Sequence, residues 1–395
     1  PRGPQRHDMT NRPKQVAVLG STGSIGRSTL EVIDHSDGRL SVVALSGNTN
    51  VELLARQTAH FRPRWVVLTD STAAGSFDRS CLSAGTELLV GSEALERVAA
   101  KDDVDTVVSA IVGSAGLLGT WAALAAGKRV ALANKETLVI AGELVTRLAR
   151  ERRAEIIPVD SEHCAVFQAL QAGRREEVRR IILTASGGPF RNHTAEQLAN
   201  VTIDEALEHP TWKMGQKITV DSATMMNKAL EIVEARWLFD LDPDQITVTI
   251  HPQSVVHSVV EYKDGSAIAQ LSPPDMKLPI QYALDWPERH EGVSSRLDWS
   301  QPWRLDFEPP DVERFEALEL GLEVARRGGT TGAVLNGANE AAVAAFLGGR
   351  LGFARIVPAV RAALDNHDFD PHPDLERLLA MDRWAREEVL RWIGA

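Results

Sequence analysis

The sequence predicts an α/β protein in which a doubly wound parallel sheet is followed by an α+β domain and then by a helical domain. Two changes in pattern along the chain support this prediction. Strand-type and helix-type runs alternate over residues 15–155, whereas longer β-branched runs follow over 156–285. From residue 312 onwards only helix-type patterns remain. Alternating strands and helices indicate βαβ units, and a later change of pattern indicates a separate domain.

The first unit opens with the apolar run QVAVL, a glycine-rich turn and a helix pattern. Each later strand-type run likewise precedes a helix-type run, which is typical of parallel strands joined by crossover helices. The expected strands cover 15–19, 41–46, 65–70, 105–113 and 129–133, and later helix patterns include 121–127 and 143–150. We therefore expect a Rossmann-like sheet in residues 15–155.

The second unit, residues 156–285, carries the features of an α+β domain. β-Branched runs lie at 179–186 and 245–252, and Lys263-Asp264-Gly265 marks a hairpin turn. The helix patterns between these runs cover 162–172 and 225–239.

The remaining segments differ in composition. Residues 286–311 are rich in Pro, Trp and Asp, which predicts an extended linker, whereas residues 312–395 predict a helical domain. The last helix pattern places one apolar face on Leu375, Leu378, Leu379, Ala385, Val389 and Trp392. Residues 1–14 are polar and rich in Pro and Arg, so we expect a disordered tail there.

Composition and charge exclude several classes of protein. The chain has 395 residues, 44% hydrophobic and 25% charged, and a net charge of -11. Such a charge argues against nucleic acid or an anionic membrane as the main partner, although local basic groups can still bind a small anion. No apolar run approaches the roughly 20 residues that span a bilayer. The only cysteines, Cys81 and Cys164, predict a reducing compartment, and we expect a cytoplasmic protein.

A glycine-rich turn follows the first expected strand. Gly20, Gly23 and Gly26 form GxxGxxG, where a helix N-terminus can bind a pyrophosphate and glycines let it approach the backbone. Thr22, Ser24 and Ile25 would supply the contacting amides and hydroxyls. This spacing differs from GxGxxG, so the alternative is a tight turn without a ligand.

The end of the second expected strand indicates which dinucleotide would bind. An NAD site usually has an acidic residue there, but this chain has Ser46, Gly47, Asn48 and Asn50. A carboxylate would repel a 2′-phosphate, whereas neutral donors accept it. The sequence therefore favours NADP over NAD.

Three acidic residues are candidates for a metal site. Asp160 and Glu162 stand two residues apart at the end of an apolar run, where side chains of a strand would point to the same side. Glu231 lies in a later helix pattern. Hard divalent cations bind such carboxylates, and no Cys/His set indicates zinc. The alternative is that these acids cap a helix or face solvent.

Polar residues around Glu231 suggest a phosphate site. Ser222, Asn227 and Lys228 precede or open its helix, and Lys228 shares a helix face with Glu231. The alternative is a surface ion pair with Ser222 as N-cap.

Three further segments are candidates. Ser186 precedes two glycines in a phosphate loop or a plain turn, and Lys135 follows a strand, where ligands of open α/β sheets bind. HPTWKMG, residues 209–215, is either a mobile lid or an ordinary loop. His251 and His257 are expected to be structural.

Together these motifs resemble one family, the 1-deoxy-D-xylulose 5-phosphate reductoisomerases. The resemblance is carried, in chain order from about Lys14 to Ile393, by GSTGSIG, SAIVGSAGL, LANKE, PVDSEH, SGGPF, HPTWKMG, KITVDSATMMNKALEIVEARWLF, IHPQSVVHS and PPDMKLPI. It implies a homodimer that rearranges the sugar phosphate by retro-aldol cleavage and re-addition. NADPH then reduces the product to 2-C-methyl-D-erythritol 4-phosphate, in non-mevalonate isoprenoid biosynthesis.

The resemblance also implies roles for residues of the second, catalytic unit and of the first. The metal ligands, for Mn²⁺, Mg²⁺ or Co²⁺, would be Asp160, Glu162 and Glu231. Substrate contacts would be Lys135, Ser161, Glu162, Ser186, His209, Ser222, Asn227, Lys228 and Glu231, of which Lys135, Glu162, Glu231 and His209 would be catalytic. NADPH contacts would be Thr22, Gly23, Ser24, Ile25, Asn134, Glu136 and Gly215, and the flap, 206–216, would carry Trp212 and Met214.

One segment departs from the family pattern. After SVVALSG this chain has Asn48-Thr49-Asn50, where many members have Lys-Asn. Any of Gly47, Asn48 and Asn50 could therefore meet the 2′-phosphate. Ala185 also replaces a frequent glycine.

Two other functions compete with this prediction. A semialdehyde- or homoserine-type NAD(P)-dependent dehydrogenase would need a catalytic cysteine or a Lys/Asp relay, but Cys164 lies in an apolar stretch with only His163 beside it. A non-catalytic NADP-sensing module would have no use for the three acids and Lys135.

Overall fold

The structure is a computed structural model that describes residues 12–212 and 214–394. The tail expected over residues 1–14 lies outside the described residues as far as residue 11, and the first strand, β1, begins at Lys14. None of the described helices is long and apolar enough to cross a membrane.

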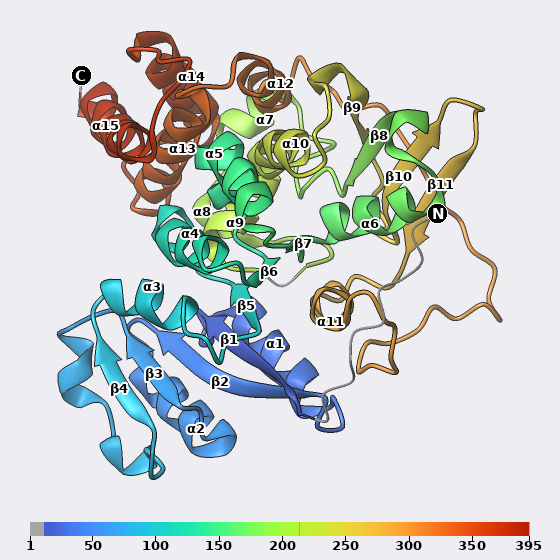
Figure 1. Ribbon diagram of the computed structural model, residues 1–395. Helices are drawn as coiled ribbons and strands as arrows, with labels where there is room; N and C mark the ends of the chain where they lie inside the picture. Colours follow the sequence, from blue (N-terminus) through green and yellow to red (C-terminus); the bar gives the residue numbers. More distant parts are fainter. Residues whose placement is uncertain (1–11, 213, 395) are drawn as a thin grey trace.

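The first part of the chain forms a seven-stranded parallel sheet of order β4-β3-β2-β1-β5-β6-β7 (Figure 1). The order reverses between β1 and β5, so their carboxyl ends flank a crevice of the kind that binds ligands in open α/β sheets. The strands are β1 (Lys14–Leu19), β2 (Leu40–Gly47), β3 (Trp65–Leu68), β4 (Glu87–Val90), β5 (Thr106–Ser109), β6 (Arg129–Leu132) and β7 (Ile156–Pro158). The last strand lies just beyond residue 155.

Both faces of this sheet are covered, because successive β1 side chains enter different cores. Ala17 and Leu19 belong to one hydrophobic cluster, whereas Val16 and Val18 belong to another. The intervening helices are α1 (Ser24–Asp34), α2 (Val51–Phe61), α3 (Glu93–Ala99), α4 (Leu117–Ala125) and α5 (Glu136–Arg152). Burial on both faces explains why the strands are apolar runs without alternation.

One expected strand is shorter than predicted. The pattern at 105–113 predicted a strand throughout, but β5 ends at Ser109. The next residues leave the sheet towards Gly113, whose φ of 77° turns the chain. Ala110, Ile111 and Val112 line a cavity.

The second part contains a four-stranded sheet of order β11-β10-β8-β9. β10 is antiparallel to β8 and β11, and the expected turn at Lys263-Asp264-Gly265 joins β10 to β11. The strands are β8 (Val178–Ala185), β9 (Ile246–Ile250), β10 (Val256–Tyr262) and β11 (Ala267–Leu271), and the helices are α6 (Ser161–Ala169), α7 (Ala195–Ala199), α8 (Ile203–Leu207), α9 (Gln216–Ala223), α10 (Met226–Leu238) and α11 (Lys277–Asp285).

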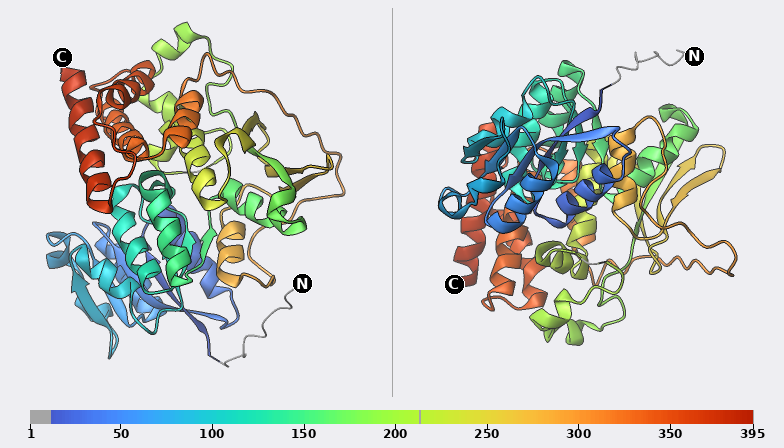
Figure 2. Two further views of the ribbon diagram at one scale, coloured as in Figure 1. Left: turned by 45° about the horizontal axis from the view of Figure 1, so that its top comes forward. Right: turned by 90° about the horizontal axis from the view of Figure 1, so that it is seen from below.

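Helix α11 joins this part to the first sheet. Its residues Ile280, Ala283 and Leu284 belong to the same hydrophobic cluster as Val16 and Val18, and it packs against α1. The next segment, 286–311, has no helix or strand and runs along the outside of the molecule (Figure 2).

The last described residues contain four α-helices: α12 (Ala317–Arg327), α13 (Thr331–Leu347), α14 (Ile356–Asn366) and α15 (Leu375–Gly394). α13, α14 and α15 gather at one end of the molecule, whereas α12 lies against α10 (Figure 1). α13 packs against α14, α15 and α5, so the helical part also supports the first unit. The predicted apolar face of α15 is directed inwards, with Leu378, Ala385 and Val389 buried.

Candidate active site

A cavity of about 750 Å³ lies where the carboxyl edge of the first sheet meets α6, α9, α10 and β8. It contains most of the residues proposed from the sequence. Those that line it are Ser24, Ile25, Asn134, Lys135, Glu136, Asp160, Ser161, Glu162, Ser186, His209, Trp212, Met214, Gly215, Ser222, Asn227, Lys228 and Glu231. Its size suits a small molecule bound beside a cofactor.

The three candidate acids converge in this cavity. Carboxylate oxygens of Asp160, Glu162 and Glu231 lie within 4.8 Å of one another. Asp160 and Glu162 come from the start of α6, and Glu231 comes from the middle of α10. These acids therefore neither face bulk solvent nor lie scattered over the surface.

Asp160 and Glu162 do not lie on a strand, so the prediction that a strand aligns them is wrong. The strand β7 ends at Pro158, and Asp160 is the N-cap of α6, with Glu162 in the first helical turn. The Asp160 side chain makes no capping hydrogen bond, so its carboxylate does not stabilise the end of the helix. The two carboxylates meet because the chain turns into a helix between them.

Two buried lysines face the acids. Lys135 forms ion pairs with Asp160 and with Glu231 Oε1, the latter at 3.2 Å. Lys228 donates to Glu162 Oε1 at 2.7 Å and also pairs with Glu231. Burial alone would lower the lysine pKa values, but the carboxylates outweigh it and raise both. Both side chains are therefore cationic at neutral pH.

The acids respond differently to this crowding. Burial, reinforced by the charge of Glu162, raises the pKa of Glu231 to about 7. Burial also disfavours charge on Glu162, but Lys228 more than compensates and holds the pKa of Glu162 below its usual range. The repulsion between these carboxylates would be relieved by a cation between them.

The geometry fits a hard divalent cation. The donors are carboxylate oxygens from three residues, the type that Mg²⁺ and Mn²⁺ prefer. Asp160 Oδ2 is buried and accepts no hydrogen bond of normal geometry, although Lys135 pairs with it. This oxygen is therefore paired with an ammonium group, and a cation bound here would take over that positive charge.

A second group of polar side chains gathers at the other side of the cavity. His209 Nε2 lies 3.2 Å from Ser186 Oγ and 3.1 Å from Ser222 Oγ. His209 Nδ1 accepts hydrogen bonds from the backbone N–H groups of Thr211 and Trp212. Because Nδ1 is an acceptor, Nε2 carries the proton and donates to a hydroxyl. Two hydroxyls and an imidazole N–H suit a phosphate.

The structure contradicts the alternative in which Ser222 caps the following helix. Ser222 lies in the last turn of α9, and the N-cap of α10 is Met225, whose φ is 61°. Gly188 approaches this turn closely, since a Cβ there would lie 2.6 Å from Ser222 O. The glycines after Ser186 therefore bring two separate segments together.

Asn227 belongs to the acid cluster. Its Oδ1 accepts from Lys135 Nζ at 2.8 Å, and its Nδ2 donates to Glu231 Oε1 at 2.6 Å. Ser161 Oγ donates to Glu162 at the same acid cluster.

The glycine turn is closed by tight backbone contacts and leads into an uncapped helix. A Cβ on Gly20 would lie 2.7 Å from Ala110 O, and one on Gly26 would lie 2.3 Å from Gly20 O. α1 begins at Ser24 and has no side-chain cap, so its first N–H groups are free for an anion. Ser24 and Ile25 line the cavity.

The other dinucleotide candidates lie outside the cavity lining. A Cβ on Gly47 would lie 3.2 Å from the Thr22 methyl group, so the ends of β1 and β2 are adjacent. Asn48 is exposed, whereas Asn50 Oδ1 accepts from Leu53 N at 3.2 Å and caps α2. Of the three residues left open for the 2′-phosphate, Asn50 thus already has a structural role.

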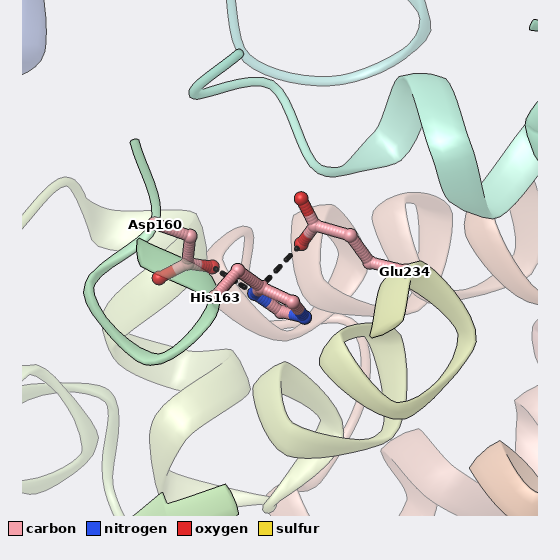
Figure 3. Close-up of side chains that lie close together, drawn as sticks. All are labelled: Asp160, His163 and Glu234. Carbon is pink, nitrogen blue, oxygen red and sulfur yellow. Dashed lines mark ion pairs between the residues drawn. The ribbon is translucent and has the colours of Figure 1, made fainter. Parts of the chain in front are cut away.

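Sequence reasoning missed a buried pair behind the acids (Figure 3). His163 Nδ1 lies 3.3 Å from Glu234 Oε2 and 3.8 Å from Asp160 Oδ2, and its Nε2 donates to Glu231 O at 3.0 Å. The sequence signal for this pair was the spacing of Glu234 from Glu231, which puts both on adjacent turns of α10.

Cys164 does not suit the role of a dehydrogenase nucleophile, because burial raises the pKa of its thiol to about 12.

The two later histidines differ in position. His251 Nδ1 donates to Asp306 O, and its Nε2 accepts from Val255 N and Val256 N, so it ties together backbone segments. His257 donates to Ser272 O and also lines the cavity, where Trp212 packs 6.2 Å away between ring centroids.

Three family models match this chain. The model of 1-deoxy-D-xylulose 5-phosphate reductoisomerase matches residues 16–142, and that of its C-terminal domain matches 156–239. The DXP reductoisomerase C-terminal domain matches 271–388. The chain belongs to the 1-deoxy-D-xylulose 5-phosphate reductoisomerase family. This confirms the resemblance and the enzyme class, and it does not favour a semialdehyde- or homoserine-type dehydrogenase or an NADP-sensing module.

Curated reductoisomerases match over nearly their whole length. The enzyme of Chlorobium chlorochromatii is 51% identical over 374 residues, covering 95% of this chain and 98% of the relative. That of Moorella thermoacetica is 52% identical over 376 residues, covering 95% and 97%.

Solved reductoisomerase structures share the fold. The enzyme from Zymomonas mobilis in complex with NADPH has a TM-score of 0.91 at 43% identity, covering 97% of this chain and 100% of that one. A DOX-P reductoisomerase in complex with NADPH, fosmidomycin and magnesium also has a TM-score of 0.91 at 43% identity, covering 96% and 98%. The predicted fold class is thereby confirmed.

Proposed function

We propose that this reductoisomerase-family chain converts 1-deoxy-D-xylulose 5-phosphate into 2-C-methyl-D-erythritol 4-phosphate, using NADPH and a divalent cation, in non-mevalonate isoprenoid biosynthesis. One observation carries the proposal for the site. Acids from two separate helices converge on one cavity, beside the carboxyl edge of a doubly wound sheet. That arrangement supports a cation site beside a dinucleotide site.

Asp160, Glu162 and Glu231 would hold the cation. When bound, it supplies a Lewis acid that polarises the ketone of the substrate, and NADPH supplies the hydride. Lys135 lies against the same acids with a protonated ammonium group, so it can donate a hydrogen bond or a proton to a substrate oxygen.

The phosphate of the substrate would bind at the other side of the cavity. Ser186, Ser222 and His209 present hydroxyl and imidazole N–H groups there. Asn227 and Lys228, also proposed as substrate contacts, line the same cavity and contact Glu231. Anchoring a phosphate remote from the reacting carbons supplies binding energy that holds both fragments for recombination.

NADPH would lie along the glycine turn and the β6–α5 turn. Support comes from the uncapped start of α1 and from Asn134 and Glu136, which line the cavity. We assign the 2′-phosphate to the segment Gly47–Asn50, where Asn48 is exposed and Asn50 is engaged as a cap. Thr22, Gly23 and Gly215 complete the proposed set.

The loop with Trp212 and Met214 would close over the ligands. Its two ends are anchored by α8 and α9, and the side chains of both residues line the cavity. Lys213 lies outside the described residues. Closure would exclude water from the reacting carbons and the hydride.

We also infer a homodimer in the cytoplasm. β11 is an edge strand whose Ala267, Ile268 and Ala269 are exposed, and Trp299 of the linker is 73% exposed. Edges and aromatic side chains exposed in this way are typical of an interface. Both cysteines are free, as expected in a reducing compartment. Light scattering coupled to size exclusion tests the dimer, and a monomer at micromolar concentration contradicts it.

The decisive assay follows NADPH absorbance in purified protein with deoxyxylulose phosphate and Mn²⁺. We expect oxidation that stops on addition of a chelator and resumes with Mn²⁺ or Mg²⁺. Glu231→Gln should lower kcat by at least about 100-fold, since it removes a charged ligand. A Glu231→Gln variant as fast as the parent rules out the proposed site.

A further inference from the structure

Lys217 has no role in the proposed chemistry, yet it lines the cavity with a half-buried side chain that pairs with two buried carboxylates. It stands in the first turn of α9, directly after the loop with Trp212 and Met214. Its ammonium lies 3.2 Å from Glu136 Oε1 and 2.7 Å from Asp221 Oδ2. The side chains of Glu136 and Asp221 are 7% and 1% exposed, so neither carboxylate has bulk water as an alternative partner.

These contacts extend in both directions from Lys217. Asp221 Oδ1 accepts from Asn339 Nδ2 of α13 at 2.9 Å. Glu136 Oε2 accepts from Asn134 Nδ2 at 2.9 Å, and the same Nδ2 donates to Gly113 O at 3.0 Å. One continuous line of polar contacts therefore joins the C-terminal helices to the loop after β5, and α9 contributes both Asp221 and Lys217 to it.

The charges make this link necessary. Lys217 is the partner of two buried carboxylates, and removing its ammonium leaves both uncompensated, which is strongly unfavourable. Glu136 would then turn towards water in the cavity, away from Asn134. Its displacement would disturb the wall formed by Asn134 and Glu136.

We propose that Lys217 is a positioning residue for the nicotinamide dinucleotide. It acts through Glu136, holding the β6–α5 turn in the form that binds the cofactor, and it ties this turn to the helix that anchors the flap. Cofactor affinity and flap position are coupled as a result. The inference rests on the proposed function, in which NADPH contacts Asn134 and Glu136.

The test compares Lys217→Met and Lys217→Arg with the parent by titrating NADPH against protein fluorescence, without substrate. We expect Lys217→Met to weaken the NADPH Kd about tenfold, the size of a typical coupling between sites. Lys217→Arg keeps the charge and should recover most of that affinity. In turnover assays the KM for NADPH should rise in Lys217→Met, while the KM for deoxyxylulose phosphate changes far less.

A double-mutant cycle tests the route through Glu136. Glu136→Gln should also weaken NADPH binding. The double variant, Lys217→Met with Glu136→Gln, should bind NADPH about as tightly as the single variant that binds it more weakly. Additive losses overturn the proposed route. The variant Lys217→Met/Asp221→Asn removes the carboxylate left unpaired, so it should regain stability while NADPH affinity stays low.

A matched control separates positioning from general destabilisation. Arg39 pairs with buried Asp285 away from the cavity, so Arg39→Met removes a comparable ion pair. It should lower Tm and leave the NADPH Kd unchanged. If Lys217→Met binds NADPH as the parent does, the inference fails while the proposed function stands. If the parent itself neither binds NADPH nor oxidises it with substrate, the proposed function fails.

Discussion

Two buried side chains behind the acids, Glu234 and His163, are expected to carry no charge. Glu234 is fully buried, and neither of its carboxylate oxygens has a hydrogen-bond partner of normal geometry. Burial, with added repulsion from Asp160, raises the pKa of Glu234 well above its usual range. Burial also lowers the pKa of His163 to about 4. Both groups are therefore neutral near pH 7, and a Glu234 O–H can donate to His163 Nδ1.

Replacing Glu234 by glutamine should accordingly be tolerated. The amide has the same shape, carries no charge and can also donate to His163 Nδ1, so we expect a change in unfolding free energy below about 1 kcal/mol. Glu234→Leu keeps the volume but leaves Nδ1 unsatisfied and should be less stable. Urea unfolding of the three proteins measures this, and a Glu234→Gln variant less stable than Glu234→Leu contradicts a neutral Glu234.

The three acids also predict a stabilising effect of the metal. A cation that binds the folded chain alone, at a concentration about 100 times its Kd, adds about 2.7 kcal/mol. We expect Mn²⁺ to raise Tm in the parent and to raise it much less in Glu231→Gln. Thermal scans with and without chelator supply the measurement. Equal shifts in both proteins would show that the ion binds elsewhere.

At the scale of elements, the turn between β1 and α1 depends on missing side chains. Gly20 has a φ of 88°, and Gly26 leaves room for the carbonyl of Gly20. The kink in α5 shows how a local sequence pattern can place a helix wrongly. Sequence reasoning placed a helix at 143–150, but α5 begins at Glu136, with Ala141 non-helical before Gly142. Gly142 is needed there because Trp237 packs against it.

Gly26→Ala should damage this turn and NADPH binding together. The new Cβ would lie 2.3 Å from Gly20 O, so the backbone must shift, at a cost of about 1–3 kcal/mol. Gly75→Ala is the control, because nothing lies within 4 Å of a Cβ at that position. Denaturant unfolding and NADPH titration measure both effects. Unchanged affinity in Gly26→Ala argues against a cofactor at this turn.

Over the whole molecule, the C-terminal helices support the site from behind. α13 carries Asn339, which bonds Asp221 of α9, and it crosses α15 at Gly337. A Cβ on Gly337 would lie 2.2 Å from Asp382 O, so the two helices touch through backbone. A helix that follows the cavity-lining segments in sequence thus helps to hold α9 in place.

Gly337→Val should therefore separate α13 from α15. We expect a loss of about 2–4 kcal/mol in unfolding free energy, and a weaker NADPH Kd through Asn339 and Asp221. Ala344→Val, at an exposed position of the same helix, should change stability by less than about 0.5 kcal/mol. Urea unfolding distinguishes them, and similar curves would mean that the helices can move apart freely.

Much of the fold was predictable because its causes are local. Strand and helix patterns depend on residues a few positions apart, and the family motifs name the acids, the lysines and the glycine turn. Predictions failed where a local pattern had more than one cause. Ala110–Val112 were predicted as strand although they line a cavity, and the alternative in which Ser222 is an N-cap is wrong because Ser222 lies in the last turn of α9.

The sequence by itself determined the doubly wound sheet, the order of the later units and the family. Only the tertiary structure decided that Glu231 meets Asp160 and Glu162, and that Lys217 stands between Glu136 and Asp221. The physical reason is distance along the chain. A side chain's local conformation is set by its neighbours in sequence, whereas its partners across a cavity are set by how whole helices pack.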